Sequence, residues 1–215
     1  MPEPHRIVAH QFDDAEQQQS TSMLGMWVFL ATEVMFFGGL FASYTVYRAV
    51  YAQAFAVASH HLDIVLGTLN TAVLLTSSLT MALAVRSAQV GARRSTVTLL
   101  VLTMLLGLAF LGIKGLEYYQ KYVDHLVPGP SFSFSGANLH DAEMFFYLYF
   151  AMTGLHALHM IAGVGVMSVL TILAARGRFT PAYYTPLEVG GLYWHFVDIV
   201  WIFLFPLLYL IGHHS

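Results

Sequence analysis

Apolar residues fill five long stretches of the 215-residue chain, and short polar segments separate these stretches. A helix of about twenty apolar residues is long enough to cross the hydrocarbon core of a bilayer. A segment in lipid must satisfy its own backbone hydrogen bonds, so the pattern predicts an all-α, polytopic membrane protein, a bundle of five transmembrane helices. The helices are expected at about residues 23–47, 60–85, 96–122, 140–175 and 189–212.

The domain organisation follows from the same pattern. Residues 1–21 are polar and are expected to form a cytoplasmic tail, while residues 22–215 form one five-helix transmembrane domain. Thr21 or Ser22 could cap the first helix, and a short loop is expected around residues 51–59. The fourth helix, at roughly 50 Å, is longer than a ~30 Å hydrocarbon core requires, so it must tilt or project into water.

Composition supports a membrane protein and excludes several functions. Only 10% of residues are charged and 57% are hydrophobic, whereas soluble domains carry about 25% charged residues. The chain has no cysteine, which excludes disulfides, thiolate metal sites, iron–sulfur clusters and CxxCH haem attachment. The net charge of −3, with no run of basic residues, gives no indication of nucleic-acid binding.

The distribution of Lys and Arg predicts the orientation in the membrane. Cytoplasmic segments carry an excess of these residues, so the amino terminus is expected in the cytoplasm and the carboxyl terminus outside. The polar first segment is not a cleavable signal peptide, and the first helix is expected to act as an uncleaved insertion signal. Six basic residues lie on one side and three towards the other: Arg6, Arg86, Arg93, Arg94, Arg176 and Arg178 against Arg48, Lys114 and Lys121.

The last predicted helix carries an acid inside an aromatic face. His195 and Asp198 are three residues apart and therefore lie on one side of the helix. A charge in the hydrocarbon costs at least about 2.5–3.5 kcal/mol, so Asp198 is expected to face protein and to pair with a polar group. His195 is the nearest candidate for that partner. Trp194, Trp201 and Phe205 recur on the same face.

Glu33 is the single acid of the first predicted helix and lies near its middle. An intramembrane carboxyl is a functional hypothesis by default, here a proton-related one. The alternative is a structural role as a neutral acid that is hydrogen-bonded to a neighbouring helix. Either way, we expect Glu33 to be protonated, to face protein and to donate a hydrogen bond to a carbonyl or to a hydroxyl of another helix, such as that of Thr71 or Ser78.

The remaining polar groups form two sets. Lys114 and Lys121 can both reach Glu117 along one helix, which predicts a structural ion cluster near the membrane interface. His156 and His159 are one turn apart and are expected to face one way. They could bind a metal, but a zinc site needs a third ligand and no HExxH motif exists. We therefore favour the interpretation that His156 and His159 form hydrogen bonds with neighbouring helices. No catalytic, metal or haem site is expected in this chain.

Several segments resemble subunit III of the haem-copper oxidases, the cytochrome c and quinol oxidases. The resemblance covers about residues 22–212 and begins at the family's third helix, which matches the bacterial five-helix short form. Leu155 and Ala157 depart from the family's run of residues at that position. The segments that carry the resemblance are Tyr193–Phe203, Met26–Phe37 with its buried glutamate, Leu69–Ser78, Gly115–Tyr119, Thr153–His159 and Glu188.

The resemblance implies a non-catalytic subunit of a proton-pumping cytochrome c oxidase of aerobic respiration, in the bacterial cytoplasmic membrane. Subunit III of this family flanks subunit I, assembles with subunit II and other subunits, supports proton uptake and stabilises the catalytic subunit. The haems and copper are expected in those partner subunits. Membrane lipids are expected partners, although the long family members hold theirs in a cleft formed with two helices that are absent here.

Three alternatives remain at this stage. The first is subunit III of a quinol oxidase, since no feature of the sequence identifies the electron donor. The second is the related accessory subunit of nitric oxide reductase. The third is a stand-alone transporter or haem-binding membrane protein, although inverted repeats and broken helices, which are typical of transporters, are not seen.

Overall fold

The computed structural model describes residues 11–135 and 138–210. Within these ranges, five helices are long and apolar enough to cross a membrane, which confirms the predicted all-α bundle. The elements in chain order are α1 (Ala15–Val50), α2 (Ala52–Ser59), α3 (Ile64–Gln89), α4 (Arg93–Val123), α5 (Leu139–Ala175), α6 (Thr185–Phe205) and the π-helical turn η1 (Pro206–Leu210).

The start of α1 differs from the prediction. The helix begins at Ala15, eight residues before the expected position, so part of the polar segment is helical. Asp14 caps it, because its side chain accepts a hydrogen bond from the backbone N–H of Gln17 at 2.7 Å. The proposed caps at Thr21 and Ser22 are therefore wrong. Hydropathy locates where lipid begins, whereas the cap residue determines where the helix begins.

The segment expected as a loop between the first two spans is largely the short helix α2. It is apolar enough to pack, and Phe55 is buried against Phe145 of α5 with ring centroids 5.4 Å apart. The next helix therefore starts later than expected, at Ile64, where the Asp63 side chain accepts hydrogen bonds from two backbone N–H groups.

The end of the chain's last span is also irregular. The helix α6 begins at Thr185 with Pro186 in its first turn, a position where the missing N–H costs nothing. Its α-helical part ends at Phe205, because Pro206 cannot donate the next helical hydrogen bond. The five residues that follow form a π-helical turn, η1, in which Leu208 and Tyr209 are buried.

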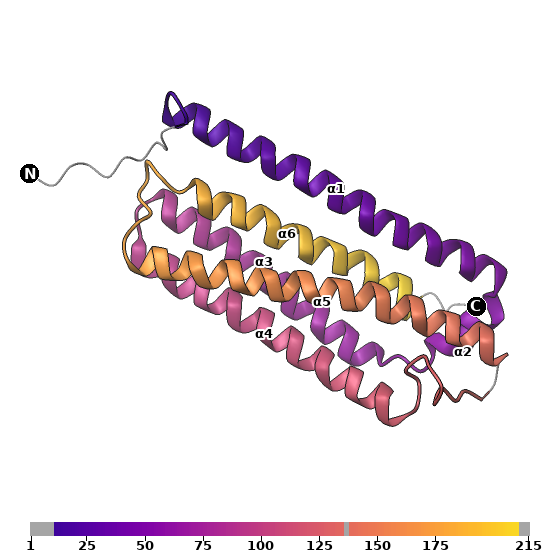
Figure 1. Cartoon of the computed structure of the whole chain (residues 1–215). Helices are drawn as coiled ribbons and strands as arrows, with labels where there is room; N and C mark the ends of the chain where they lie inside the picture. Colours follow the sequence, from indigo (N-terminus) through magenta and orange to yellow (C-terminus); the bar gives the residue numbers. More distant parts are fainter. Residues whose placement is uncertain (1–10, 136–137, 211–215) are drawn as a thin grey trace, which may run out of the picture.

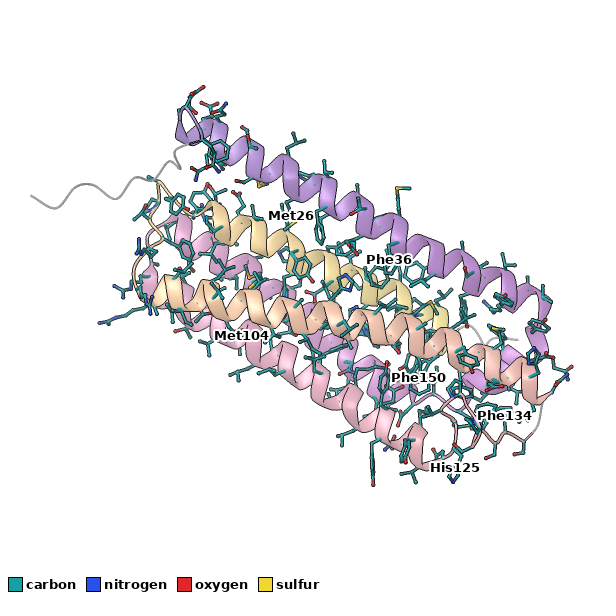
Figure 2. The ribbon with its side chains drawn as sticks, in the orientation of Figure 1. Met26, Phe36, Met104, His125, Phe134 and Phe150 are labelled. Carbon is teal, nitrogen blue, oxygen red and sulfur yellow. The ribbon has the colours of Figure 1, made fainter. Side chains whose placement is uncertain are left out.

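The helix α6 is the centre of the bundle. It packs against α3, α5 and α1, whereas α1 lies at the margin and contacts mainly α6 and α5 (Figure 1). Close approach around α6 depends on glycine: a Cβ atom at Gly107 would lie 2.7 Å from the Trp194 ring. Large apolar side chains project outward along α1 and α4 (Figure 2), as expected for helices that face lipid or partner chains.

Candidate functional site

A fully buried ion pair lies between Lys114 and Glu117, three residues apart on α4. The Lys114 Nζ and Glu117 Oε2 atoms are 2.9 Å apart, and the two side chains are 3% and 0% exposed. Tyr149 of α5 and Tyr209 of η1 both donate hydrogen bonds to Glu117 Oε1. Lys114 also lies 5.1 Å from the Trp201 ring centroid. The cluster thereby joins α4, α5 and both parts of the last span.

Lys121 does not complete this cluster as predicted. Its Nζ donates instead to the backbone carbonyl of His61 at 2.6 Å, at the end of α2. The predicted ion pair between Lys114 and Glu117 is therefore present, but it is deep in the bundle and its second set of partners consists of tyrosines. A sequence argument places Lys121 within reach of Glu117, but it does not reveal a nearby carbonyl on another segment.

Glu33 pairs with His159 across the α1–α5 contact. The Glu33 Oε2 and His159 Nε2 atoms are 3.1 Å apart, and each side chain is 19% exposed. The expected partners, Thr71 and Ser78, bind elsewhere: Trp201 donates to Thr71, and Ser78 bonds His195. The carboxyl therefore faces protein as predicted, but its partner is an imidazole.

The hydrogen bonds of His159 constrain where a proton lies. Its Nδ1 is 2.8 Å from the carbonyl oxygen of Leu155, which can only accept, so Nδ1 carries a hydrogen. Nε2 then either accepts from a protonated Glu33 or donates, as imidazolium, to a Glu33 carboxylate. In both cases the Glu33 oxygen and His159 Nε2 share one proton, and the pair is neutral overall.

The predicted pairing of His195 with Asp198 is wrong. His195 Nδ1 lies 2.6 Å from the hydroxyl oxygen of Ser78 on α3. Asp198 is buried, 2% exposed, but neither carboxyl oxygen has a hydrogen bond of normal geometry within the described residues. The helical spacing puts the two side chains on one side of α6, but helix packing turns the His195 ring towards α3.

His156 and His159 face different neighbours, contrary to the prediction. His156 lies between the rings of Phe110 and Trp201, with centroids 5.4 and 5.3 Å away. Neither of its nitrogens has a hydrogen-bond partner among the described residues, whereas His159 bonds Glu33. In the part of the chain that the structure describes, no three His, Cys, Asp or Glu side chains gather as a metal site would require.

Some hydroxyls of α3 bond across helices, and two aromatic roles were not predicted. Trp194 donates its indole N–H to Ser77 at 3.1 Å, and the hydroxyls of Thr80 and Thr103 are 2.8 Å apart. The sequence pattern assigned no role to Tyr149 or Tyr209, yet both bind the buried Glu117. A signal was present, because a buried carboxylate needs several donors and Tyr is the donor that an apolar helix most readily supplies.

These features define a class of protein before any comparison. It is a polytopic α-helical membrane bundle whose polar groups are paired between helices, and the described histidines are not arranged around a shared ligand position. The chain belongs to a known family: a family model described as cytochrome c oxidase subunit III matches residues 9–213.

Individual relatives support this assignment over most of the chain. The chain is 35% identical to cytochrome c oxidase subunit 3 of Corynebacterium diphtheriae, with 87% of each chain covered. It is 32% identical to cytochrome bo(3) ubiquinol oxidase subunit 3 of Pseudomonas aeruginosa, covering 95% of this chain and 92% of that one. It is 31% identical to quinol oxidase subunit 3 of Bacillus subtilis, covering 89% and 87%. The protein is thus a haem-copper oxidase subunit III, and it belongs to a multi-subunit membrane complex rather than being a stand-alone transporter.

Proposed function

We propose that the chain supports proton uptake by the catalytic subunit of a proton-pumping cytochrome c oxidase and stabilises that subunit during aerobic respiration. In this proposal it contacts mainly subunit I, together with subunit II and other oxidase subunits and membrane lipids. Oxygen is reduced in the partner subunits, which hold the haems and copper. This chain contributes no metal ligand and no catalytic residue.

The observation that carries the proposal is the pair formed by Glu33 and His159. Both side chains are inside the span, and together they share one proton between Oε2 and Nε2. Both retain partial exposure at 19%, in contrast to the fully buried Glu117. A protonatable pair at the outside of a bundle can exchange protons with groups of a neighbouring subunit, whereas Glu117 is enclosed by its own chain.

The substitution Glu33→Gln tests this role in the purified complex. Gln keeps the shape and can still bond His159, so assembly and the haem and copper content should stay unchanged. We expect fewer protons pumped per electron, or a shorter active life during turnover. Glu16→Gln, in the first turn of α1 and exposed, is the matched control. If both variants pump and survive like the parent, the proposal is wrong.

A chemical probe gives a second test of the same pair. Hydrophobic carbodiimides react with protonated carboxyls in apolar surroundings, so they should modify Glu33 before other acids of the chain. His159→Leu removes the imidazole that shares the proton. It should change the rate of Glu33 modification without changing that of Glu16, and peptide mass spectrometry measures both rates. Equal reaction at Glu33 in the parent and in His159→Leu would contradict proton sharing.

The electron donor has a second candidate, quinol, because relatives named for quinol oxidases match the chain over the same length. The relatives named for cytochrome c oxidases are 32–37% identical to the chain, and those named for quinol oxidases are 31–32% identical, so sequence identity does not separate the two donors. Purification through a tag on this chain, followed by subunit identification and oxidation of reduced cytochrome c or of quinol, distinguishes the two. Reduction of nitric oxide instead of oxygen would point to the reductase accessory subunit.

The proposed location is the bacterial cytoplasmic membrane, with the amino terminus in the cytoplasm and the carboxyl terminus outside. Support comes from the basic residues at the α3–α4 connection and the end of α5, where Arg93 donates to the carbonyl of Ala175. The start of α1 lies at this same end of the bundle (Figure 1). Reporter fusions after Arg94 and Ser215 should report cytoplasm and exterior. The same side for both would contradict the orientation.

A further inference from the structure

A groove of about 440 Å³ runs between α1 and α6, on the side of α6 that faces α3. Its walls are almost entirely apolar and aromatic. Trp27, Val34 and Phe37 line it from α1, and His195, Ile199 and Phe203 line it from α6. The groove therefore lies between α6, the most buried of the five long helices, and α1, the least buried.

At this groove, part of α6 is exposed at the surface of the bundle. Ile199 and Phe203, one turn apart, are 50% and 60% exposed, although most of the helix is buried. On the opposite wall, Trp27 and Val34 are each 58% exposed. Two facing helices thus present large side chains whose outer surfaces no other described element covers.

His195 gives this groove a hydrogen-bonding requirement. It lies ten residues from each end of α6, or about 15 Å, which is the middle of a ~30 Å hydrocarbon core. Its Nδ1 bonds Ser78, while its Nε2 has no hydrogen-bond partner among the described residues. The ring is half-buried and forms part of the groove wall. The free nitrogen is therefore presented at mid-membrane, where an unpaired polar atom is costly.

The depth of His195 in the membrane indicates which kind of molecule occupies the groove. Lipid acyl chains carry no hydrogen-bonding group, and the ester and phosphate groups of a phospholipid lie at the interface, about 15 Å from this level. A transmembrane helix can place a polar side chain at its midpoint, and such polar contacts join helices in membranes. The family to which the chain belongs consists of subunits of multi-subunit oxidases, so partner helices are available.

We propose that the α1–α6 groove is the docking site for one transmembrane helix of another subunit of the oxidase complex. A polar side chain near the middle of that helix bonds His195 Nε2, and apolar side chains fill the groove against Trp27, Val34 and Ile199. This inference rests on membership of a complex and not on the proposed proton role, because Glu33 bonds His159 towards α5, away from the α3 side where His195 lies.

Photo-cross-linking in native membranes that contain the intact complex tests the occupant. A benzophenone amino acid replaces Val34 or Ile199 in the groove, and Leu105 of α4 serves as a control with similar exposure, 57%. We expect adducts from Val34 and Ile199 with one partner subunit, mapped to a transmembrane segment with a polar residue, at yields above that of Leu105. Adducts with lipid only, with a second copy of this chain, or at the yield of Leu105 would overturn the proposal.

The role of His195 is tested separately by two substitutions in the same complex. His195→Leu removes the hydrogen bond and should weaken subunit association about threefold to twentyfold, while His195→Gln keeps a polar group and should weaken it less. Association is measured as retention of the partner during detergent titration. If both variants weakened subunit association equally, His195 would not form the proposed hydrogen bond with the partner helix. A complex with no haem-copper subunit would contradict the proposed function, whereas oxidase subunits with lipid-only adducts would contradict this inference alone.

Discussion

Helices α1 and α6 have nearly the same mean hydropathy, and both are long enough to cross a membrane. In the most apolar window of α1 only 11% of residues are buried within the chain, against 61% for α6. Their side chains explain the difference. α6 combines glycines with large aromatic residues such as Trp194 and Trp201, which interlock with α3, α4 and α5. The exposed residues of α1 are mostly aliphatic and aromatic groups without a packed counterpart.

The two helices are also attached by different polar contacts. The last span is fixed by Tyr209, whose hydroxyl bonds both members of the buried pair Lys114 and Glu117. The helix α1 is joined to α5 by Glu33 and His159, whose side chains are each 19% exposed. Apolarity therefore identifies which segments enter the membrane, whereas the distribution of aromatic, small and polar groups determines which segment becomes the core.

The largest expected effect comes from breaking the enclosed ion pair. Glu117→Leu leaves Lys114 uncompensated inside the bundle and should cost about 3–5 kcal/mol of stability. Glu33→Leu on the peripheral helix should cost much less, because Glu33 and His159 are each 19% exposed and are not enclosed as Lys114 and Glu117 are. The temperature at which this chain dissociates from the purified complex measures both. The double variant Lys114→Met with Glu117→Leu should recover much of the loss, since it removes both charges; no recovery would contradict a charge effect.

Apolar packing should show the same contrast between the two helices. Phe196 of α6 is 7% exposed and Phe36 of α1 is 48% exposed, so the same truncation can be compared in two settings. Phe196→Ala leaves a cavity beside Phe37 and should cost about 3 kcal/mol. Phe36→Ala should change stability by less than about 0.5 kcal/mol. Equal shifts in dissociation temperature would show that α1 is packed as tightly as α6.

Sequence reasoning succeeded where the property is local to one helix. The five spans and the burial of Asp198 both follow from the kind of residue and its depth. Sequence reasoning failed to identify the hydrogen-bond partners of individual side chains. His195 was assigned to Asp198 and bonds Ser78, while Glu33 was assigned to an α3 hydroxyl and bonds His159. Such choices depend on which helices pack together and on how each one is rotated, and neither quantity is encoded in spacing along a single helix.

The helix boundaries failed for a related reason. The start of α1 was placed where the apolar run begins, but the side chain of Asp14 starts the helix earlier, in polar sequence. The short helix α2 was taken as a loop because it is too brief to span a membrane. Both errors concern residues outside the apolar spans, where capping and tertiary contacts decide structure and hydropathy carries no information.

Glycine substitutions test the same difference in packing between the two helices, with smaller expected changes in stability. A Cβ atom at Gly163 of α5 would lie 3.2 Å from the Trp194 ring, which is itself enclosed and unable to move aside. Gly163→Ala should therefore cost about 1–3 kcal/mol through overpacking. At Gly39 of α1 nothing lies within 4 Å of an added Cβ. Gly39→Ala should stabilise the chain by about 0.5–1 kcal/mol, because Ala loses less backbone entropy in a helix. Dissociation temperatures that fall equally would contradict the difference in packing.

The smallest expected effect is the coupling between Glu33 and His159, which a double-mutant cycle isolates. Glu33→Leu and His159→Leu each remove several contacts, including the ring contact of His159 with Phe37 at 5.2 Å. In the cycle those other losses cancel, so the remainder is the interaction between the two side chains. Polar contacts between membrane helices average about 0.6 kcal/mol and reach about 1.7. Partial exposure favours the lower value for a pair at the margin, and the dissociation temperatures of the four variants supply the measurement. A coupling of about 3 kcal/mol or more would mean that α1 is fixed to the bundle as firmly as the last span is by Glu117.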